Sequence, residues 1–303
     1  MSDIFLIDGN AIGYAAQAGS KLSVGKQQTQ AIFGVIRALR GMRLAKAGAY
    51  KAVLWDGRAH WRIAAYPEYK ANRDTNVVQR AMRDAYKSQK TYIEQAVTLL
   101  GIDQMKSMSC EADDLAGALA QHFSRQGHQV RLVTGDKDWL QLVNATTVWH
   151  DIRTDKLVDL SNFEEMTKLK HPYQILDQKC LMGDSSDNIK GCGGIGAVGS
   201  LQLLDVYGSV RNFLKLYDAG RLSGIPAAWT KLGSNDGGTR DRYLLNEKLM
   251  SLTGAAKPGV DERVVTKGAF DPIAFRTFAE DFAFHSILSD YDRWIAPFNK
   301  RHV

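Results

Sequence analysis

Ile4-Phe5-Leu6-Ile7-Asp8 is a short apolar run that ends in a carboxylate, and the same pattern occurs twice more in the chain. The second run is Ala52-Val53-Leu54-Trp55-Asp56, and the third is Val130-Arg131-Leu132-Val133-Thr134-Gly135-Asp136. Nearly continuous apolar runs of this length are typical of parallel strands that are buried on both faces. Segments with helical spacing of apolar residues lie between them, at 30–44, 77–100 and 112–123. The pattern predicts an α/β fold with a parallel sheet.

Acidic residues are concentrated where these strands end and where helices begin. In an open α/β sheet the ligand crevice lies outside the carboxyl ends of the strands, so we expect Asp8, Asp56 and Asp136 to converge there. Divalent Mg²⁺ prefers carboxylate oxygens, and a two-metal site holds its ions roughly 4 Å apart around an in-line displacement. The candidate metal ligands are Asp8, Asp56, Glu111, Asp113, Asp114, Asp136, Asp138, Asp184 and Asp187.

Each acidic motif also has a purely structural interpretation. A strand-final Asp caps helices and turns in many proteins, and acids in the first turn of a helix interact favourably with the helix dipole. However, three acids within Glu111-Ala112-Asp113-Asp114 exceed what capping requires, and their mutual repulsion favours a bound cation. No histidine or cysteine accompanies the carboxylates as a ligand pair, which favours Mg²⁺ or Mn²⁺ over zinc.

A basic stretch with interleaved tyrosines follows the second strand. Cations with aromatic side chains suit phosphate contacts and base stacking on single-stranded nucleic acid, although the same residues also fit a solvated helix face. The stretch contains Arg62, Tyr66, Tyr69, Lys70, Arg73, Arg80, Arg83, Lys87 and Lys90.

A glycine-rich segment at 188–199 precedes another helical pattern. Small residues there would let backbone N–H groups approach a phosphate at a helix N-terminus, without reading sequence. A tight helix-to-helix turn is the alternative. The candidate DNA contacts in this segment are Lys190, Gly191, Gly193, Gly194 and Gly196.

The chain beyond residue 172 is predicted to be mainly helical. We expect a catalytic core at 1–172 and a helical DNA-binding region at 173–303, with a mobile Gly- and Ser-rich loop at 223–239. Asp271-Pro272 fits a helix cap followed by proline at the first helical position.

Composition restricts the class of protein. The 303 residues include 39 Lys and Arg against 33 Asp and Glu, and the formal charge of +6 favours polyanionic partners. Cys110, Cys180 and Cys192 have no spacing for a zinc site or a disulfide framework. No apolar stretch is long enough to cross a bilayer, so we expect a cytoplasmic monomer.

Taken in order, six stretches resemble the 5′ nuclease family, which includes phage flap endonucleases and the 5′ nuclease domain of bacterial DNA polymerase I. They are LIDGN at 6–10, WDGRAHWR at 55–62, YPEYKANRD at 66–74, EADDLAG at 111–117, TGDKDWLQL at 134–142 and LMGDSSDNIKGCGGIG at 181–196. The resemblance covers the first two thirds of the chain, and the last third matches only loosely. No polymerase domain follows residue 303, which is similar to free-standing phage members.

The resemblance implies an acidic parallel-sheet nuclease core, a helical arch at about 62–92 for a 5′ single strand, and a helix-hairpin-helix at about 175–207. It implies that Asp138, Asp184 and Asp187 serve the second of two metal ions and the other acids the first. Tyr69 would stack on the terminal base, while Lys70, Arg73 and Lys179 would act in catalysis. A potassium ion at the hairpin and a DNA polymerase partner are further expectations from the family.

Three other classes of protein share part of this sequence pattern. A single-strand ribonuclease on a related acidic core has no need of the glycine hairpin. A haloacid-dehalogenase-type phosphatase requires a second Asp two residues after the first, and position 10 is Asn. A non-catalytic binder of branched DNA would need the charge of nine clustered acids offset without catalytic benefit. Metal-dependent cleavage of a labelled 5′ flap separates these classes.

Overall fold

The predicted parallel strands lie at the centre of a larger mixed sheet. The structure is a computed structural model that describes residues 2–19, 21–46, 48–254 and 257–299. Its main sheet has the order β11-β5-β4-β1-β6-β7-β8, in which β5, β4, β1, β6 and β7 are parallel and the two edge strands are antiparallel to their neighbours. The strands are β1 (Asp3–Asp8), β4 (Tyr50–Trp55), β5 (Asp103–Lys106), β6 (Gln129–Val133), β7 (Thr147–Asp151), β8 (Lys156–Val158) and β11 (Val264–Thr266).

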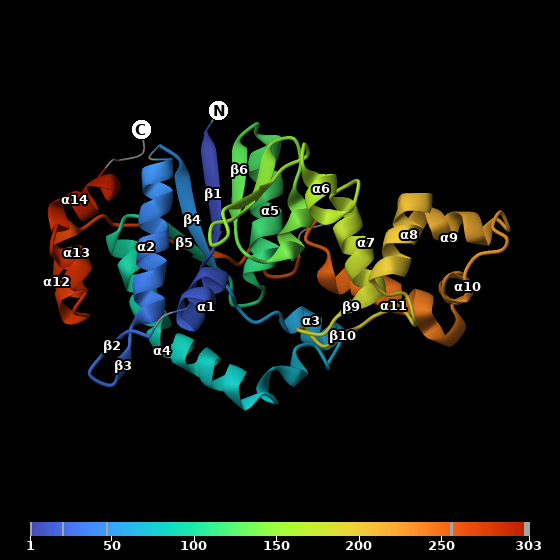
Figure 1. Cartoon of the computed structure of the whole chain (residues 1–303), viewed down its shortest axis with the longest axis horizontal. Coiled ribbons are helices and arrows are strands. Elements are labelled where there is room, and N and C mark those ends of the chain that lie inside the picture. The colour runs from blue at the N-terminus through green and yellow to red at the C-terminus, as the bar shows by residue number, and fades with distance from the viewer. Residues whose placement is uncertain (1, 20, 47, 255–256, 300–303) are drawn as a thin grey trace.

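Alternate residues of the central strands face two separate cores. Ile4 and Leu6 of β1 pack into one core with helix α5 (Ala112–Arg125), whereas Phe5 and Ile7 pack into the other. The second core is covered by α2 (Gln30–Ala45) and α4 (Val77–Leu99), with α1 (Gly9–Gly19) packed against both. Figure 1 shows these helices on either side of the sheet. Burial on both faces explains why the strands are apolar throughout.

Between β4 and α4 the chain leaves the sheet and forms α3 (His60–Ala65) and the short helix η1 (Ala71–Asp74). Helix α4 is amphipathic in one half only: Val77 and Val78 near its start are exposed, while Ile93 and Val97 near its end are buried. Its first half therefore extends beyond the sheet, below α1 and beside α3 (Figure 1). A two-stranded ribbon, β2 (Ser23–Val24) and β3 (Gln27–Gln28), follows the C-terminal end of α1 in the chain.

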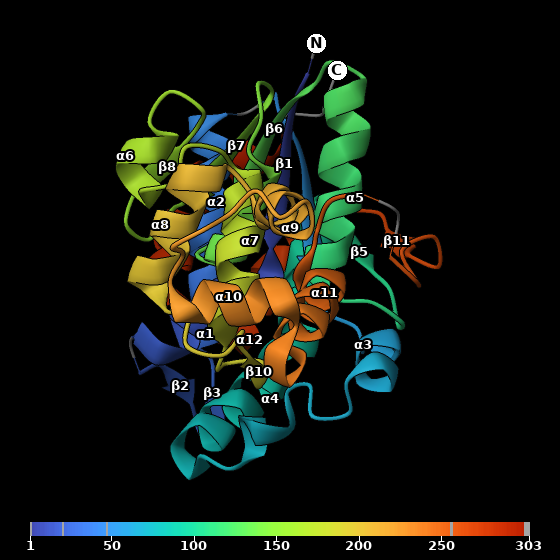
Figure 2. The same cartoon turned by 90° about the vertical axis from the view of Figure 1, so that its right-hand side faces the viewer.

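From Tyr173 to Met250 the chain is mainly helical, as predicted. The 3-10 helix η2 (Lys137–Leu142) lies earlier, between β6 and β7, and α6 (Phe163–Thr167) follows β8. Helix α7 (Tyr173–Met182) is followed by the two-stranded ribbon of β9 (Gly183–Asp184) and β10 (Ile189–Lys190). The remaining helices of this lobe are α8 (Ala197–Tyr207), α9 (Val210–Asp218), α10 (Ala227–Ser234), η3 (Asp236–Gly238) and α11 (Thr239–Met250). Figure 1 shows α8, α9, α10 and α11 gathered at one end of the molecule, and this end faces the viewer in Figure 2.

Two expectations about this half need correction. The segment 223–239 is not simply a loop, because Trp229 and Leu232 of α10 are buried in the first core. The structure also departs from a helical region running from 173 to the C-terminus. Strand β11 pairs with β5 in the main sheet, and α12 (Pro272–Asp281), α13 (His285–Leu288), α14 (Tyr291–Ile295) and η4 (Ala296–Phe298) return to the second core.

The return of the C-terminal helices depends on aromatic packing. Phe275 stacks on Trp294 with ring centroids 5.4 Å apart, and Arg40 of α2 lies over the Trp294 ring. The cap predicted at Asp271 is confirmed, since its carboxylate accepts from the N–H groups of Ile273 and Ala274.

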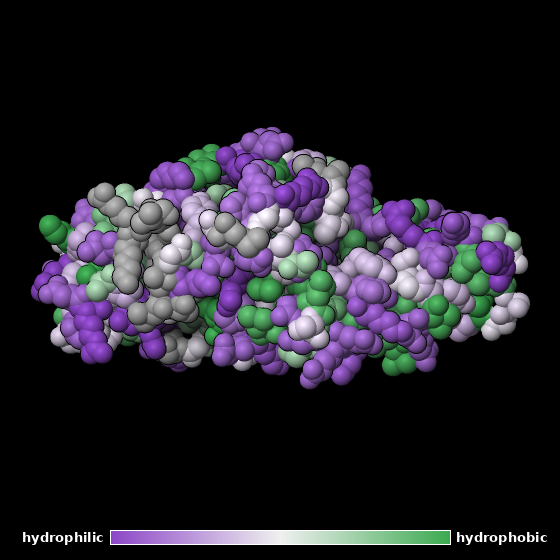
Figure 3. Space-filling view, turned by 90° about the horizontal axis from the view of Figure 1, so that it is seen from above, coloured by the Kyte–Doolittle hydropathy of each residue, from purple (hydrophilic) through white to green (hydrophobic). Residues whose placement is uncertain are grey.

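The outer surface is mainly polar. Figure 3 shows the top face as an elongated, largely hydrophilic surface with small scattered hydrophobic patches. All three cysteines are buried and unpaired, as expected. In the described part of the chain, no helix combines the length and apolar character needed to cross a membrane.

Candidate active site

Strand-final carboxylates meet at one edge of the sheet. The parallel register of β1 with β4 pairs Asp8 with Leu54, so β4 ends and Asp56 follows at the same edge. Asp8 is buried and accepts from the Ala11 N–H at 2.9 Å and the Thr134 hydroxyl at 2.8 Å. Burial, followed by repulsion from Asp56, raises the pKa of Asp8 to about 7.

Glu111 and Asp113, at the start of α5, lie at this same edge. The Ala112 N–H donates to Asp56 at 2.9 Å, and the Trp139 indole N–H donates to Asp113 at 2.7 Å. Burial, then repulsion from Asp136, Asp56 and Asp8, raises the pKa of Asp113 well above its usual value. Such mutual repulsion in a buried place is the environment that a divalent cation relieves. We call Asp8, Asp56, Glu111, Asp113 and Asp136 the first carboxylate group.

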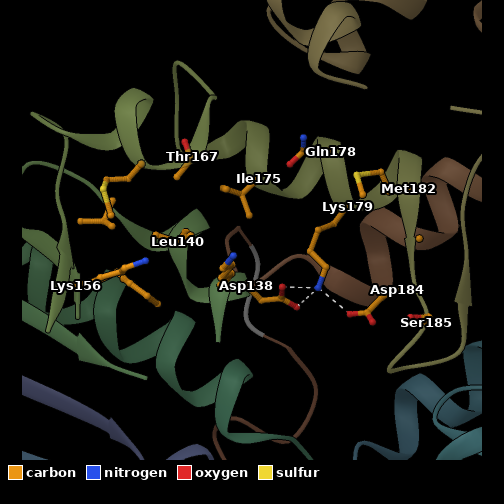
Figure 4. A pocket seen from close by; sticks show the side chains of 15 residues that line it. Asp138, Leu140, Lys156, Thr167, Ile175, Gln178, Lys179, Met182, Asp184 and Ser185 are labelled. Atoms are coloured by element: carbon orange, nitrogen blue, oxygen red, sulfur yellow. Dashed lines mark hydrogen bonds and ion pairs between the residues drawn. The ribbon is translucent and has the colours of Figure 1, made fainter. Parts of the chain in front are cut away.

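Asp138 and Asp184 form a second carboxylate group with a lysine between them. Lys179 of α7 donates to both carboxylates, at 2.5 Å to Asp138 Oδ2 and 2.8 Å to Asp184 Oδ2 (Figure 4). Burial and Asp136 raise the pKa of Asp138 to about 6 despite the lysine. For Asp184 burial is outweighed by Lys179 and by the backbone and hydroxyl of Ser186, which hold its pKa at about 2.

Asp187 connects the second group to the segment before α4. Arg73 reaches its Oδ1 at 2.9 Å, and the Tyr69 hydroxyl reaches its Oδ2 at 3.1 Å. Lys70 donates to Glu111 Oε1 at 2.6 Å and lies 3.7 Å from Asp187. Its backbone is in the left-handed region at φ 59° and donates to the Asp187 carbonyl, which fixes the start of η1 against the β9–β10 turn. Lys70 and Arg73 thus lie between Glu111 of the first group and Asp187, three residues after Asp184 of the second.

Arg62 departs from its expected place among phosphate contacts. It is 2% exposed and forms a bidentate pair with Asp114, at 2.6 and 2.7 Å, with a third bond to Glu111 at 3.1 Å. Asp114 also closes a capping box with Glu111. Both Asp114 oxygens are occupied in this way, so the structure turns Asp114 toward Arg62 and does not bring it to the carboxylate groups.

Tyr69 also differs from expectation. Its side chain is 7% exposed, and its hydroxyl donates to Glu111 at 2.7 Å. Little of the ring is open to a base, and Lys70 and Arg62 lie over it at 4.7 and 5.9 Å. Tyr69 instead positions Glu111 and Asp187. Its position in the sequence next to Lys70 gave no signal that the ring is buried.

The other predicted basic residues extend along α4. Arg80 and Lys87 are exposed, and Lys87 lies 3.8 Å from Asp84. Arg83 donates to the Arg73 carbonyl and so holds the start of α4 against η1. Lys90 lies over the Trp55 ring, and burial lowers its pKa. The sequence places Lys90 in the basic stretch but gives no sign of this contact beside Asp56.

The glycine segment joins α7 to α8 as a hairpin. Gly193 and Gly194 have φ values of 40° and 92°, which explains the need for glycine at both positions. Gly191 lies against Met182, where a Cβ would come within 2.4 Å of the carbonyl oxygen. Gly196 caps α8, is exposed, and has no atom within 4 Å of a Cβ position. Lys190 is exposed and lies 3.6 Å from Glu68.

The donor set fits hard divalent cations. Both groups offer carboxylate oxygens, with neither thiolate nor imidazole, as Mg²⁺ or Mn²⁺ prefers. Among residues 2–19, 21–46, 48–254 and 257–299, no three acidic, His or Cys side chains are already gathered around one point as ligands. The raised pKa values of Asp8 and Asp113 nevertheless show uncompensated repulsion, which added positive charge would relieve.

Two family models match the chain in succession. The "5′-3′ exonuclease, N-terminal resolvase-like domain" matches residues 3–168, and the "5′-3′ exonuclease, C-terminal SAM fold" matches residues 170–264. A 5′-3′ exonuclease of Mycoplasma genitalium is 34% identical over 223 residues, covering 70% of this chain and 75% of the relative. DNA polymerase I of Bacillus subtilis is 28% identical over 318 residues, covering 99% of this chain but 34% of the relative.

Solved structures show the same fold. A bacteriophage T5 flap endonuclease, in a pseudo-enzyme-product complex with DNA and metal ions, has a TM-score of 0.68 at 19% identity, covering 98% of each chain. A T5 5′-exonuclease with bound divalent zinc ions has a TM-score of 0.69 at 20% identity, covering 93% of this chain and 98% of the other. The chain spans about a third of the Bacillus polymerase and three quarters of the Mycoplasma enzyme. On the strength of the two family models and the Mycoplasma relative, the chain belongs to the 5′-3′ exonuclease family.

Proposed function

We propose that this protein is a structure-specific 5′ nuclease that hydrolyses phosphodiester bonds of flapped, branched or nicked DNA. It acts as a 5′-3′ exonuclease and flap endonuclease, in primer removal or repair. One observation carries the proposal: Lys70, on the segment before α4, donates to Glu111 of the first carboxylate group, and Arg73 pairs with Asp187, on the segment that leads into the α7–α8 hairpin. This arrangement suits a strand that passes α4 while its duplex rests on the hairpin.

The carboxylates are the proposed metal ligands. Asp8, Asp56, Glu111, Asp113 and Asp136 would hold one divalent ion, and Asp138, Asp184 and Asp187 the other. When bound, two such ions supply the positive charge that stabilises the attacking and leaving oxygens of an in-line displacement. Asp114 is proposed to act through Arg62 on the position of Glu111.

Three cations of the chain would act on the phosphate. Lys70 and Arg73 are aimed at the space between the carboxylate groups, so we assign them to stabilising the charge that develops on the scissile phosphate. Lys179 balances Asp138 and Asp184 until the substrate arrives and then becomes available to a phosphate oxygen. The Tyr69 hydroxyl bonds to both Glu111 and Asp187 and so fixes the positions of their carboxylates.

The hairpin is the proposed grip on duplex DNA. Exposed backbone N–H groups at Gly193, Gly194 and Gly196, with Lys190 beside them, would contact phosphates without reading bases. Backbone carbonyls of the same loop would hold a potassium ion. A ribonuclease acting on single strands has no use for such a grip, so this hairpin favours a duplex-containing substrate.

Cleavage of three labelled substrates tests the proposal: a 5′-flapped duplex, single-stranded RNA and blunt duplex DNA, each with and without Mg²⁺. We expect Mg²⁺-dependent cleavage near the flap junction and little cleavage of the RNA. Asp184→Ala should bind the flap as well as the wild type but cut it at least about a hundredfold more slowly. Equal cleavage by Asp184→Ala, or preference for the RNA, would overturn the proposal.

A further inference from the structure

A cavity of about 510 Å³ opens beside the second carboxylate group and runs away from it. In Figure 4 Asp138, Lys179 and Asp184 lie at one end, while Lys156 and Thr167 lie at the other. Its walls come from η2, β7, β8, α6, α7 and the start of β9. Its size falls within the range of ligand pockets, roughly 300 to 1,000 Å³.

One part of the lining is apolar. Leu140, Val158 and Ile175 are buried and belong to the first core, and their inner faces line the cavity. Met166 and Met182 stand at the rim with 40% and 44% of their surface exposed. Flexible thioether side chains make favourable contacts with aromatic rings, and exposed pairs of them are common at binding surfaces. This part suits a flat, largely apolar group.

The other part is polar and has spare hydrogen-bonding capacity. Within the part of the chain that the structure describes, the side chains of Lys137, Lys156 and Gln178 form no hydrogen bond or ion pair. Both lysines are exposed, and the Gln178 amide offers donors and an acceptor together. Ammonium groups suit a phosphate, and a primary amide suits the mixed edge of a nucleobase.

From these contacts we propose that this cavity, which we call the side pocket, binds one nucleoside phosphate. The base lies against Leu140 and Ile175 with its edge toward Gln178, and the phosphate lies near Lys156. The inference rests on the proposed function for the source of its ligand. Two sources share this chemistry: the mononucleotide that exonucleolytic cleavage releases, and an unpaired nucleotide of a DNA strand bound at the carboxylates.

The position of Lys179 connects the side pocket to the second carboxylate group. Its ammonium is shared by Asp138 and Asp184, and all three residues line the cavity. A nucleotide in the side pocket therefore shares its cavity with this lysine and with both carboxylates. We expect mononucleotide and DNA to affect each other's binding.

Two variants probe the side pocket. Lys156→Ala removes a phosphate contact, and Gln178→Trp fills the cavity from a half-buried position on α7. Lys231→Ala is the matched control, because Lys231 is an exposed lysine on α10 outside the cavity. Thermal melting of each protein establishes that it is folded before binding is measured.

Titration calorimetry with deoxyadenosine monophosphate supplies the first test, with Ca²⁺ present to prevent turnover. We expect measurable binding to the wild type and to Lys231→Ala, and at least about tenfold weaker binding to Lys156→Ala and Gln178→Trp. Absence of binding to wild type, or equal affinity in all four folded proteins, would overturn the proposal.

A second arm distinguishes the two sources. The affinity of each protein is measured for nicked DNA with and without one unpaired nucleotide beside the nick. If the wild type binds the mononucleotide, and Lys156→Ala loses affinity only for the DNA with the unpaired nucleotide, the DNA strand is the source of the ligand. If the wild type binds the mononucleotide, and Lys156→Ala and the wild type have equal affinities for both DNA substrates, the released mononucleotide is the source. Flap cleavage by wild type, run in parallel, separates the two proposals. If the wild type cleaves the flap but does not bind the mononucleotide, only the proposal of a nucleotide site in the side pocket is wrong. If it binds the mononucleotide but does not cleave the flap, the proposed nuclease substrate is wrong.

Discussion

Arg62 links three parts of the catalytic end through a single guanidinium. It pairs with Asp114 and Glu111 at the start of α5 and donates to the Leu249 carbonyl of α11 at 2.9 Å. Truncating one partner of a buried pair leaves an uncompensated charge, so Arg62→Ala should lower the free energy of unfolding by about 3 to 5 kcal/mol. Urea denaturation measures this loss.

The matched control for Arg62 is Arg211, which pairs with Glu247 at 2.6 Å but is 69% exposed. Arg211→Ala should change the free energy of unfolding by about 1 kcal/mol or less. A loss as small for Arg62→Ala as for Arg211→Ala would contradict a structural role for the buried pair.

Lys70 is expected to act on the transition state more than on DNA affinity. It is half-buried beside Glu111 and Asp187, whereas a residue that only grips phosphate would extend into solvent. Lys70→Ala should lower the single-turnover cleavage rate about a hundredfold, equivalent to roughly 3 kcal/mol, even with enzyme in saturating excess. Recovery of the wild-type rate at saturation would make Lys70 a simple phosphate contact.

At the scale of residues, sequence alone located the carboxylates but not their partners. Asp8 and Asp136 were foreseeable because strand ends of a parallel sheet share an edge. Arg62 and Tyr69 were not, because their burial depends on α5 and α11, which are distant in the chain. The pattern of cations and aromatics around 62–73 is the same for exposed and buried side chains.

The α7–α8 hairpin is the element whose function depends most on its backbone. Gly196 has φ −88° and open space around its Cβ position, so substitution there leaves the fold intact. Gly196→Leu should weaken duplex affinity about tenfold or more at every sequence, since a side chain would stand between the backbone N–H groups and a phosphate. Gel-shift titration with several unrelated duplexes measures this.

Gly41→Leu serves as the control for the hairpin. Gly41 is exposed on α2 with nothing within 4 Å of its Cβ position, and it lies far from the hairpin (Figure 1). Its affinity should equal that of wild type. A loss in Gly196→Leu for some sequences but not others would indicate base reading instead of phosphate contacts.

Strand β11 is attached to the sheet through Asp103. Burial raises the pKa of Asp103, but the Lys267 ammonium at 2.8 Å, the Gly268 N–H and the Tyr50 hydroxyl outweigh it and hold the pKa below its usual range. A carboxyl whose pKa is lower in the folded state stabilises the fold above its unfolded pKa and loses that contribution as the pH falls.

We therefore expect the stability difference between wild type and Asp103→Asn to be constant above about pH 5 and to shrink toward pH 3 and below. Urea denaturation across this range measures it. Asp205→Asn is the control, because Asp205 pairs with Lys170 on the exposed surface of the helical lobe. A difference for Asp103→Asn that grows on acidification would contradict the sign of its pKa shift.

Sequence patterns predicted long helices better than short elements and strands that pair with distant parts of the chain. The helices at 30–44, 77–100 and 112–123 were correct because their apolar faces are long enough to show a period. Helix α10 was missed because glycine and serine surround it, and only Trp229 and Leu232 anchor it. Strand β11 has an exposed pattern throughout, so nothing local indicates that it pairs with β5, which lies far earlier in the chain.

The whole molecule separates negative charge from positive charge. Acids gather at the sheet edge, while the exposed cations Arg80 and Lys87 lie on α4 and Lys190 lies on the hairpin. A net charge of +6 understates this, because seven of the 33 acidic residues belong to the two carboxylate groups. The surface that faces a DNA backbone is consequently more basic than the composition indicates.

Arg80 and Lys87 on the exposed part of α4 should contribute to this field without taking part in the chemistry. Each phosphate contact releases counterions, so losing one reduces the slope of log affinity against log salt by about 1. Arg80→Ala and Lys87→Ala should each weaken flap binding at low salt and flatten its salt dependence, with little change in cleavage rate once binding is saturated. Arg125→Ala, an exposed arginine at the end of α5, should leave the slope unchanged. Fluorescence anisotropy over a range of salt concentrations gives the slopes, and single-turnover cleavage gives the rates. An unchanged slope together with a slower saturated rate would place these two residues in the catalytic machinery with Lys70, and α4 would then act on the reaction itself.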